Sequence, residues 1–290
     1  MSNTRVLRFA PSPTGFLHIG HAYSFEFTHR LAGGGSIKLR VEDIDPARSR
    51  IEFVEAMLED MAWLGLPWEP SPLFQSERMP VYKEALQELI DRELVYPCFC
   101  SRKEILAEIS EAGGAPHGPV GLSYPGTCRN LSADEIQTRK ESYSDYSYRL
   151  NLESCKKQLG VLAWHDRFSG KHSVEYSALS DPVLARRDTP TSYHLSVVID
   201  DAYQQIDLVT RGHEIMPSTN VHRILQASLN LPTPEYAHHA MVLGDDGRPF
   251  AKRNGAQPVR ELRQKGFTPA QILDLAIRRL DDSSRHWCHA

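Results

Sequence analysis

The N-terminal part of the chain predicts a strand, a helix and a second strand in succession. Val6 and Leu7 are apolar and precede a turn that is rich in proline and glycine. Residues 22–31 have the composition of a helix, which the glycines at 33–35 end before the apolar run at 37–41. This order is typical of an α/β domain with a parallel sheet.

Two amphipathic helices are expected next. Ile51, Val54, Leu58 and Met61 recur at helical spacing, and residues 79–94 repeat the pattern from a start beside Pro80. We interpret both as packing elements of a first half-domain, residues 1–94.

The pattern changes after residue 94. Paired cysteines, a Gly/Pro-rich loop at 112–126 and a short strand at 146–150 predict an inserted α+β subdomain over residues 95–181. The doubly wound pattern is then expected to resume at 182–244, with strands at 182–186, 193–201, 206–212 and 241–243 and a helix at 218–229. The run at 193–201 is interpreted as a strand buried on both faces. Residues 245–290 hold a loop and a helix at 268–280, which Thr268 caps.

Composition narrows the class of protein. A hydrophobic content of 41% and a charged content of 24% are those of an ordinary globular protein. The net charge of −4 argues against non-specific binding of nucleic acid, so any contact with RNA must be local. No run is long enough to span a membrane, and we expect a cytoplasmic monomer. An odd count of five cysteines favours metal ligation or buried thiols over a disulfide framework.

The strongest chemical signal is the run from Arg8 to His21, RFAPSPTGFLHIGH. Gly15 is expected to permit a bend with positive φ, and Gly20 to let a ligand approach the backbone. His18 and His21 lie one turn apart at the start of a helix, where side chains and the helix dipole can stabilise a phosphoryl group. The alternative is a pair of structural surface histidines.

This run resembles the HIGH signature of the class I aminoacyl-tRNA synthetases, and its first half resembles the glutamyl branch. The resemblance implies a Rossmann-type catalytic domain that binds ATP with Mg²⁺ and makes an aminoacyl-adenylate, with His18, Gly20 and His21 at the ATP. Ordinary members of the glutamyl branch continue into an anticodon-binding domain. At 290 residues this chain has no room for one, so we expect that domain to be absent.

A second signature is expected in the loop at 246–256, which resembles the KMSKS-type loop of the glutamyl branch. Lys252 corresponds to its second lysine and is predicted to be catalytic and to bind ATP. Pro249 and Ala251 depart from the pattern and remove one cation and one hydroxyl, although the adjacent Arg248 offers a replacement charge.

A dicarboxylate substrate needs two cationic clamps and an anion for its ammonium group. Arg8 and Arg211 each close a predicted strand, and Glu42 follows the neighbouring strand. Together with Ser12 and Tyr193 they coincide with glutamate-binding positions of the families that the chain resembles. The sequence leaves open which arginine takes which carboxylate, whether Asp43 or Asp45 replaces Glu42, and whether the arginines form structural ion pairs instead.

Cys98, Cys100 and Cys128 offer three thiolates, which favour zinc in tetrahedral geometry. The pattern C-x-C…Y-x-x-x-C resembles that of the glutamyl-Q family, which implies Tyr124 as fourth ligand, with His117 as a rival. Four protein ligands would make one structural zinc ion per chain. The alternative is a group of ordinary thiols, and Cys155 is interpreted as a core residue.

Taken together, the chain resembles the glutamyl-Q family, the truncated paralogue of the glutamyl branch. Val197 supports this, because relatives that charge tRNA with glutamate tend to have an asparagine there, and we expect Val197 to remove an amide from the substrate side. The implied function is ATP-dependent activation of L-glutamate and its transfer to the queuosine base in the anticodon loop of tRNA(Asp). The alternatives are a compact glutamyl-tRNA synthetase, a HIGH-type small-molecule nucleotidyltransferase and a non-catalytic RNA- or metal-binding module.

The loop assignment is tested by Lys252→Ala. Loss of the cation that faces the leaving pyrophosphate should slow adenylate formation at least about tenfold, or about 1.4 kcal/mol of transition-state stabilisation. The rate is measured by glutamate-dependent ATP–pyrophosphate exchange. A rate close to that of the unsubstituted protein would remove this loop from the mechanism.

Overall fold

The computed structural model describes residues 5–111, 117–118, 121–122, 124–187, 189–244, 247 and 257–281. Its helices are α1 (Ile19–Ala32), α2 (Ile51–Leu64), α3 (Met79–Asp91), α4 (Arg102–Glu111), α5 (Ala133–Ser142), α6 (Leu152–Leu159), α7 (Tyr193–Tyr203), α8 (Ser218–Ser228), α9 (Val259–Gln264) and α10 (Pro269–Arg278). Its strands are β1 (Val6–Phe9), β2 (Ser36–Val41), β3 (Leu73–Phe74), β4 (Val95–Cys98), β5 (His117–Gly118), β6 (Gly121–Leu122), β7 (Ser147–Leu150), β8 (Ala163–Asp166), β9 (Gly170–Ser173), β10 (Val183–Arg186), β11 (Leu208–Gly212) and β12 (Glu235–His239).

A seven-stranded sheet with the order β3-β2-β1-β11-β12-β8-β9 forms the centre of the larger lobe. Its pairs are parallel except for the antiparallel hairpin β8–β9. The strand order reverses between β1 and β11, which are far apart in the sequence. In open α/β sheets, ligands bind at such a switch point, outside the carboxyl ends of the strands.

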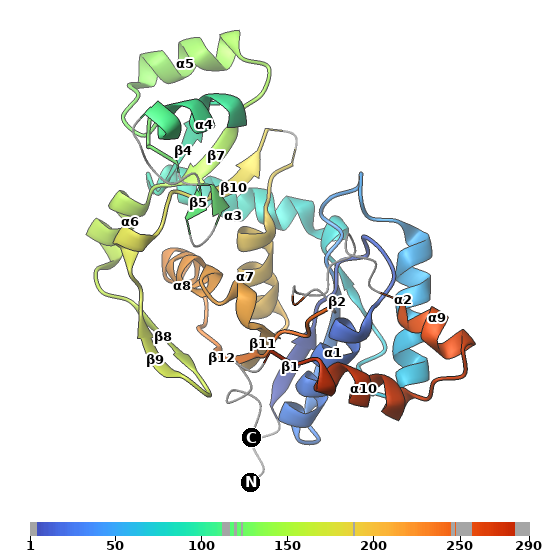
Figure 1. Ribbon diagram of the computed structural model, residues 1–290. Helices are drawn as coiled ribbons and strands as arrows, with labels where there is room; N and C mark the ends of the chain where they lie inside the picture. Colours follow the sequence, from blue (N-terminus) through green and yellow to red (C-terminus); the bar gives the residue numbers. More distant parts are fainter. Residues whose placement is uncertain are drawn as a thin grey trace.

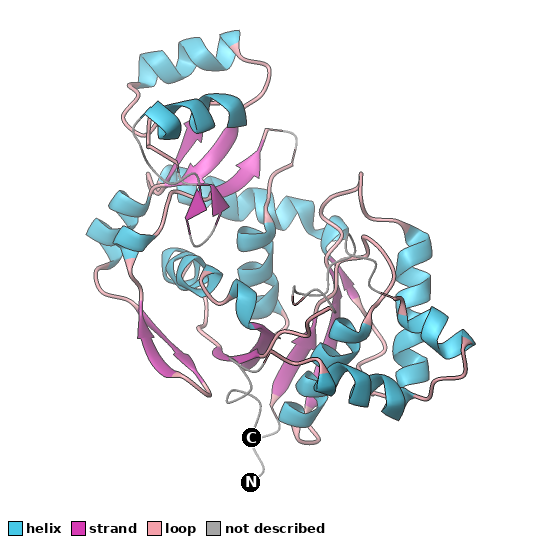
Figure 2. Cartoon of the chain, in the orientation of Figure 1, coloured by secondary structure: helices cyan, strands magenta, loops and turns pink. Residues whose placement is uncertain are grey.

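Helices cover both faces of this sheet (Figures 1 and 2). On one face, residues of β1 and β2 such as Leu7 and Leu39 pack with α1, α2, α9 and α10 in one buried cluster. On the other face, Val209 of β11 and Tyr236 of β12 pack with α3, α7 and α8 in a second cluster. The expected α/β fold with a doubly wound parallel sheet is therefore confirmed.

A smaller sheet with the order β10-β7-β4 is antiparallel and carries α4 and α5 (Figure 1). We call this part, with the cysteines next to β4, the small subdomain. The run at 182–186 was expected in the main sheet but forms β10 here, since its residues pair with β7. Conversely, β8 and β9 lie within 95–181 yet join the main sheet. Strands of the two sheets thus alternate along the chain, so a domain boundary at residue 181 does not divide one sheet from the other.

The strand expected at 193–201 is wrong, because these residues form helix α7. Residues 195–201 are all buried, since α7 packs between the sheet, α3 and α8. A short apolar run that is buried all round has no period that separates a strand from a helix. The two acidic residues at its end, Asp200 and Asp201, lie inside the protein and accept hydrogen bonds from neighbouring elements.

The other corrections are local. At 241–243 the structure describes no strand, although Val242 forms a bridge with Leu280. Gly15 does not adopt a positive φ, whereas Gly33 ends α1 with a φ of 55° as the glycine run predicts. The expected helices at 51–61, 79–94, 218–229 and 268–280 are confirmed as α2, α3, α8 and α10, and Thr268 caps α10. Among the helices of the described ranges, none is both long and apolar enough to cross a membrane.

Candidate active site

One cavity of about 600 Å³ gathers the predicted glutamate- and ATP-site residues that lie within the described ranges. It lies where β1 and β11 meet, at the carboxyl ends of the strands. Its lining includes Arg8, Ser12, His18, Gly20, His21, Glu42, Tyr193 and Arg211. Segments that are more than two hundred residues apart in the chain therefore meet in a single cleft. Lys252 and the departures at Pro249 and Ala251 lie outside the described residues.

His18 and His21 form the cap of helix α1. The Nδ1 atom of His18 accepts from the amide of Gly20 at 3.2 Å, and Nδ1 of His21 accepts from the amide of His18 at 3.2 Å. A neutral imidazole that accepts at Nδ1 carries its proton at Nε2. Both rings, with centroids 3.9 Å apart, thus hold the tautomer with an N–H donor at Nε2, beside the positive end of a helix.

Gly20 contributes space rather than a turn. A Cβ atom built at this position would lie 3.0 Å from Cε1 and 3.1 Å from Nδ1 of His18. The absence of a side chain therefore lets the ring of His18 fold back over the first turn of α1 and cap it. A contact within the protein, between Gly20 and the ring of His18, is therefore a sufficient reason for a glycine at this position of the motif.

The described residues on either side of the 245–256 loop lie at this cavity. Met241 and Val242 line it before the loop begins. After the loop, Pro258 forms an antiparallel bridge with His18, and the amide of Val259 donates to the carbonyl of Leu17 at 2.8 Å. The described residues on both sides of this segment are thus held next to the cavity.

Arg8 belongs to a buried ionic cluster. Its Nε donates to Oδ1 of Asp201 at 3.1 Å, and its Nη1 donates to the carbonyl of Thr210 at 2.7 Å. Arg40, whose side chain is fully buried, donates from Nη1 to the same Asp201 oxygen at 2.7 Å and lies 3.5 Å from Glu42. Asp201 therefore joins α7 to β1 and β2, and the cluster fixes Arg8 and Glu42 at the wall of the cavity.

The charges of this cluster depend on one another. Burial raises the pKa of Glu42, while the charges of Arg40 and Arg8 lower it, and the net direction is upward. For Asp201 burial also raises the pKa, but Arg40 and Arg8 lower it further, so its pKa is depressed. Asp201 is thus the permanent anion of the cluster, and Glu42 is the carboxylate whose charge an added cation would stabilise.

Arg211 has a different environment. Its Nε donates to Nε2 of His238 at 3.0 Å, its Nη1 lies 2.9 Å from Nδ1 of His222, and its Nη2 donates to Oγ1 of Thr219. Its guanidinium also lies over the ring of Tyr236. Within the described part of the chain, no carboxylate pairs with this buried guanidinium, so its positive charge is available to an anionic ligand in the cavity.

Burial keeps the histidines around Arg211 neutral. It lowers the pKa of His238 to about 4, against the effect of the hydrogen bond that joins His238 to Asp166 at 2.7 Å. Burial and the charge of Arg211 also lower the pKa of His222, and that of His194 to about 4. Neutral imidazoles accept hydrogen bonds, which a guanidinium requires from its neighbours.

Tyr193 and Ser12 complete the wall. Burial raises the pKa of Tyr193, so that its phenol stays protonated and polar without adding charge. Ser12 lies in the turn that the motif predicts, where its carbonyl accepts from the amide of Thr14 at 2.9 Å. The expectation for Val197 is wrong, because this residue is 2% exposed, packs in the core on α7 and does not line the cavity.

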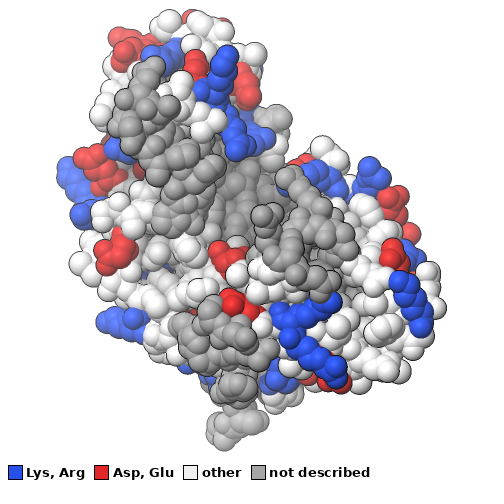
Figure 3. Space-filling view, in the orientation of Figure 1, with Lys and Arg blue, Asp and Glu red and all other residues white. Residues whose placement is uncertain are grey.

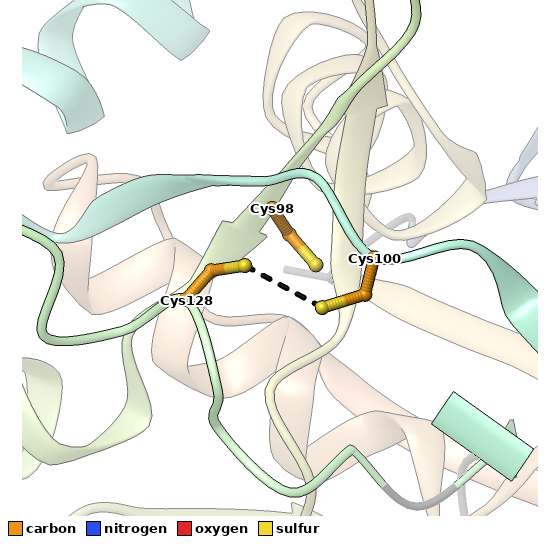
Figure 4. A group of neighbouring side chains, drawn as sticks. All are labelled: Cys98, Cys100 and Cys128. Atoms are coloured by element: carbon orange, nitrogen blue, oxygen red, sulfur yellow. Dashed lines mark hydrogen bonds between the residues drawn. The ribbon is translucent and has the colours of Figure 1, made fainter. Parts of the chain in front are cut away.

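The predicted thiols meet in the small subdomain (Figure 4). Cys98 at the end of β4, Cys100 and Cys128 point toward one another, with their sulfur atoms all within 4.8 Å. The distance between Sγ of Cys100 and Sγ of Cys128 is 3.5 Å, and the hydroxyl of Tyr124 lies 3.8 Å from Sγ of Cys100. Thiolates on one tetrahedral zinc ion are about 3.8 Å apart, so this cluster fits a metal ion.

The acidity of the thiols points the same way. Hydrogen bonds with Cys100 and Cys128 lower the pKa of Cys98, whereas hydrogen bonds with Cys128 and Cys98 raise the pKa of Cys100. The cluster thus forms one thiolate readily and resists a second, and a divalent cation removes that resistance. The side chain of His117, the rival ligand, lies outside the described residues, and Cys155 is a buried thiol elsewhere.

Sequence reasoning missed the supporting residues. Asp166, Thr219, His222 and His238 hold Arg211, yet none of them lies in a recognisable motif. His238 lies in the run Glu235–His239, which forms the buried strand β12. This run is polar and carries no strand pattern, so the sequence gives no indication of His238. The sequence predicts a strand at Asp201, and a strand there does not indicate the contact that Asp201 makes with Arg8 from helix α7.

Comparison with known proteins agrees with this geometry. The profile of the tRNA synthetases class I (E and Q), catalytic domain, matches residues 5–284. A glutamyl-Q tRNA(Asp) synthetase of Rhodobacter capsulatus is 41% identical over 92% of this chain and 98% of its own length. A glutamate--tRNA ligase of Coprothermobacter proteolyticus is 36% identical over 92% of this chain, which spans only 56% of that relative. The solved glutamate-tRNA synthetase of Elizabethkingia anophelis superposes with a TM-score of 0.74 at 28% identity and covers 87% of this chain and 53% of its own.

The neutral state of His238 makes stability depend on pH. The unfolded chain takes up a proton on this histidine near its ordinary pKa of 6.5, while the folded protein does so only near 4. Stability is therefore lost as the pH falls from 6.5 to 4. In His238→Gln, this part of the loss should disappear, so that the difference in unfolding free energy between the two proteins changes by about 1–3 kcal/mol across that window.

The measurement is urea unfolding at several pH values between 4 and 7. His165→Gln is the matched control for a change from His to Gln at an exposed position outside this network. If the unfolding free energies of the unsubstituted protein and of His238→Gln changed in parallel between pH 7 and pH 4, burial would not hold His238 neutral.

Proposed function

Because the chain belongs to the tRNA synthetases class I (E and Q), and within them to the glutamyl-Q tRNA(Asp) synthetases, we propose that it transfers glutamate to the queuosine base of tRNA(Asp). It is an ATP-dependent ligase, and ATP, glutamate and tRNA are its partners. The α-carboxylate of glutamate first attacks the α-phosphate of ATP and releases pyrophosphate. A hydroxyl of the cyclopentene ring of queuosine then attacks the activated carbonyl and releases AMP.

We assign glutamate to the end of the cavity that holds the arginines. Arg8 and Arg211 supply N–H donors and positive charge for its carboxylates. Glu42 takes the ammonium group, whose charge favours the ionised form of this buried carboxylate. The protonated phenol of Tyr193 and the hydroxyl of Ser12 add neutral hydrogen-bonding groups.

We assign ATP to the first turn of α1. The Nε2–H groups of His18 and His21 and the positive helix end face the region where charge grows on the α-phosphate as the bond to pyrophosphate breaks. Lys252 would meet the leaving group from the loop at 246–256, whose flanking residues lie next to the cavity. Mg²⁺ bound with ATP neutralises phosphate charge.

The single observation that carries this proposal is the shared cavity. Arg8 and Arg211, the carboxylate of Glu42 and the paired histidines come from separate segments, and they line one space of a size that suits small ligands. A structural role would require ion pairs for both arginines. Arg211 has none within the described ranges, whereas Arg8 has one.

The function is tested by following labelled glutamate from ATP-dependent activation onto tRNA(Asp) with and without queuosine, and onto tRNA(Glu). Label should appear only on tRNA(Asp) that carries queuosine, and after transfer the 3′ end of the labelled tRNA should still be open to oxidation by periodate. Label on the 3′ end of tRNA(Glu) would instead identify a compact glutamyl-tRNA synthetase. Absence of label from all three RNAs would contradict transfer to tRNA.

We further propose that the metal of the small subdomain is zinc, held by Cys98, Cys100, Cys128 and Tyr124 as a structural ion. Metal analysis after reconstitution under reducing conditions should find about one zinc ion per chain. Cys98→Ser should lose it, and the small subdomain should become sensitive to proteolysis. Cys155→Ser, which removes a buried thiol outside the cluster, is the control and should keep the metal. Zinc-free protein after reconstitution would contradict the assignment.

A further inference from the structure

Helix α9 begins against the segment that leads into α1. The amide of Val259, its first residue, donates to the carbonyl of Leu17 at 2.8 Å, and Pro258 forms a bridge with His18. Val259 is buried in the same cluster as Leu17. The backbone is therefore fixed on both sides of this contact, and the next residue of the helix, Arg260, lies beside the turn before α1.

Arg260 lies over an aromatic ring of that turn. Its guanidinium carbon is 4.7 Å from the ring centroid of Phe16. The ring of Phe16 also meets the ring of Phe53, on α2, edge to face at 5.0 Å between centroids. Phe16 is thus held between a cation from α9 and a ring from α2. Both kinds of contact fix the orientation of a ring, because both depend on the direction of its quadrupole.

An ion pair is the alternative role for Arg260. Among the described residues, no carboxylate lies within ion-pair distance of Arg260, whereas Arg263, one turn further along α9, pairs with Glu59 of α2 at 2.9 Å. Burial raises the pKa of Asp60 on α2 to about 6, although the charge of Arg260 lowers it from a longer distance. In the described part of the chain, the ring of Phe16 is therefore the direct partner of this guanidinium.

The outer surface of α2 and α9 carries charges of both signs. The two helices contact one another, and Figure 3 shows Lys and Arg side chains mixed with Asp and Glu side chains over them, at the right of the view. Exposed ion pairs such as Arg263–Glu59 contribute little to stability. Arg260 differs from these surface charges, since its half-buried guanidinium lies on the turn that leads to the candidate active site.

We propose that Arg260 is a positioning residue for adenylate formation, because its contact with Phe16 fixes the turn that presents His18 to the α-phosphate. Phe16 lies two residues before His18, and Leu17 between them is held by Val259. A rotation of this turn would displace the Nε2–H group of His18, and a small displacement of such a donor lowers the rate strongly. The inference rests on the proposed function, which assigns ATP to the first turn of α1.

The test compares Arg260→Gln and Phe16→Leu with Arg263→Gln, which changes an arginine of the same helix that contacts α2 instead. Glutamate-dependent ATP–pyrophosphate exchange is measured over a range of ATP and glutamate concentrations. Arg260→Gln and Phe16→Leu should each lower kcat on the order of threefold to tenfold and leave the KM for glutamate unchanged, since only a transition-state donor is misplaced. Arg260→Lys keeps a cation over the ring and should restore most of the rate. Arg263→Gln should match the unsubstituted protein.

The double variant Arg260→Gln/Phe16→Leu shows whether the two residues act through their contact. If they do, it should be no slower than the slower single variant, whereas two effects that multiply would overturn the inference. An unchanged kcat in Arg260→Gln would also overturn it, as would an equal loss in Arg263→Gln, which would place the effect in the docking of α9 as a whole. If the unsubstituted protein catalyses the exchange and the variants match it, only this inference is refuted. If it catalyses no glutamate-dependent exchange, the proposed function and the inference fail together.

Discussion

The site depends on one buried interaction, the sharing of Asp201 by Arg8 and Arg40. This carboxylate comes from α7, and the two arginines come from neighbouring parallel strands, so the contact locks a helix onto the switch point of the sheet. Removal of one partner from such a cluster leaves an uncompensated buried charge, at a cost of about 3–5 kcal/mol. The same contact orients Arg8 and, through Arg40, Glu42. The packing of the core and the arrangement of the proposed glutamate site therefore depend on the same contact.

The two arginines of the cavity differ in how they are compensated. Arg8 has an anion beside it, whereas Arg211 is surrounded by neutral imidazoles, a hydroxyl and an aromatic ring. A buried guanidinium with neutral acceptors keeps its orientation and its charge, which makes it a preformed receptor for a carboxylate. Asp166 supports this arrangement from a distance by fixing His238. The network explains why Asp166, Thr219, His222 and His238 are buried although none of them lies in a recognisable motif.

Much of this site follows from the sequence, because its chemistry sits in contiguous motifs. The run from Arg8 to His21 specifies a turn, a cap and a helix locally, and the cysteine spacing brings the thiols of Cys98 and Cys100 together. The partners of Arg211 could not be predicted, since they come from β8, α8 and β12 and meet only through the fold. The strand assigned to 193–201 failed for a related reason: burial on all sides removes the periodicity, and only the packing of α7 between the sheet, α3 and α8 decides its conformation.

We propose that one cavity holds glutamate between Arg8, Arg211 and Glu42 while α1 holds the phosphate. A crystal structure with a non-hydrolysable analogue of glutamyl-adenylate would show whether the ligand lies this way. We expect a carboxylate in contact with the arginines, the ammonium group against Glu42 and the phosphate at His18 and His21. An analogue bound with its ammonium group away from Glu42, or with its glutamyl part outside this cavity, would refute the proposed site.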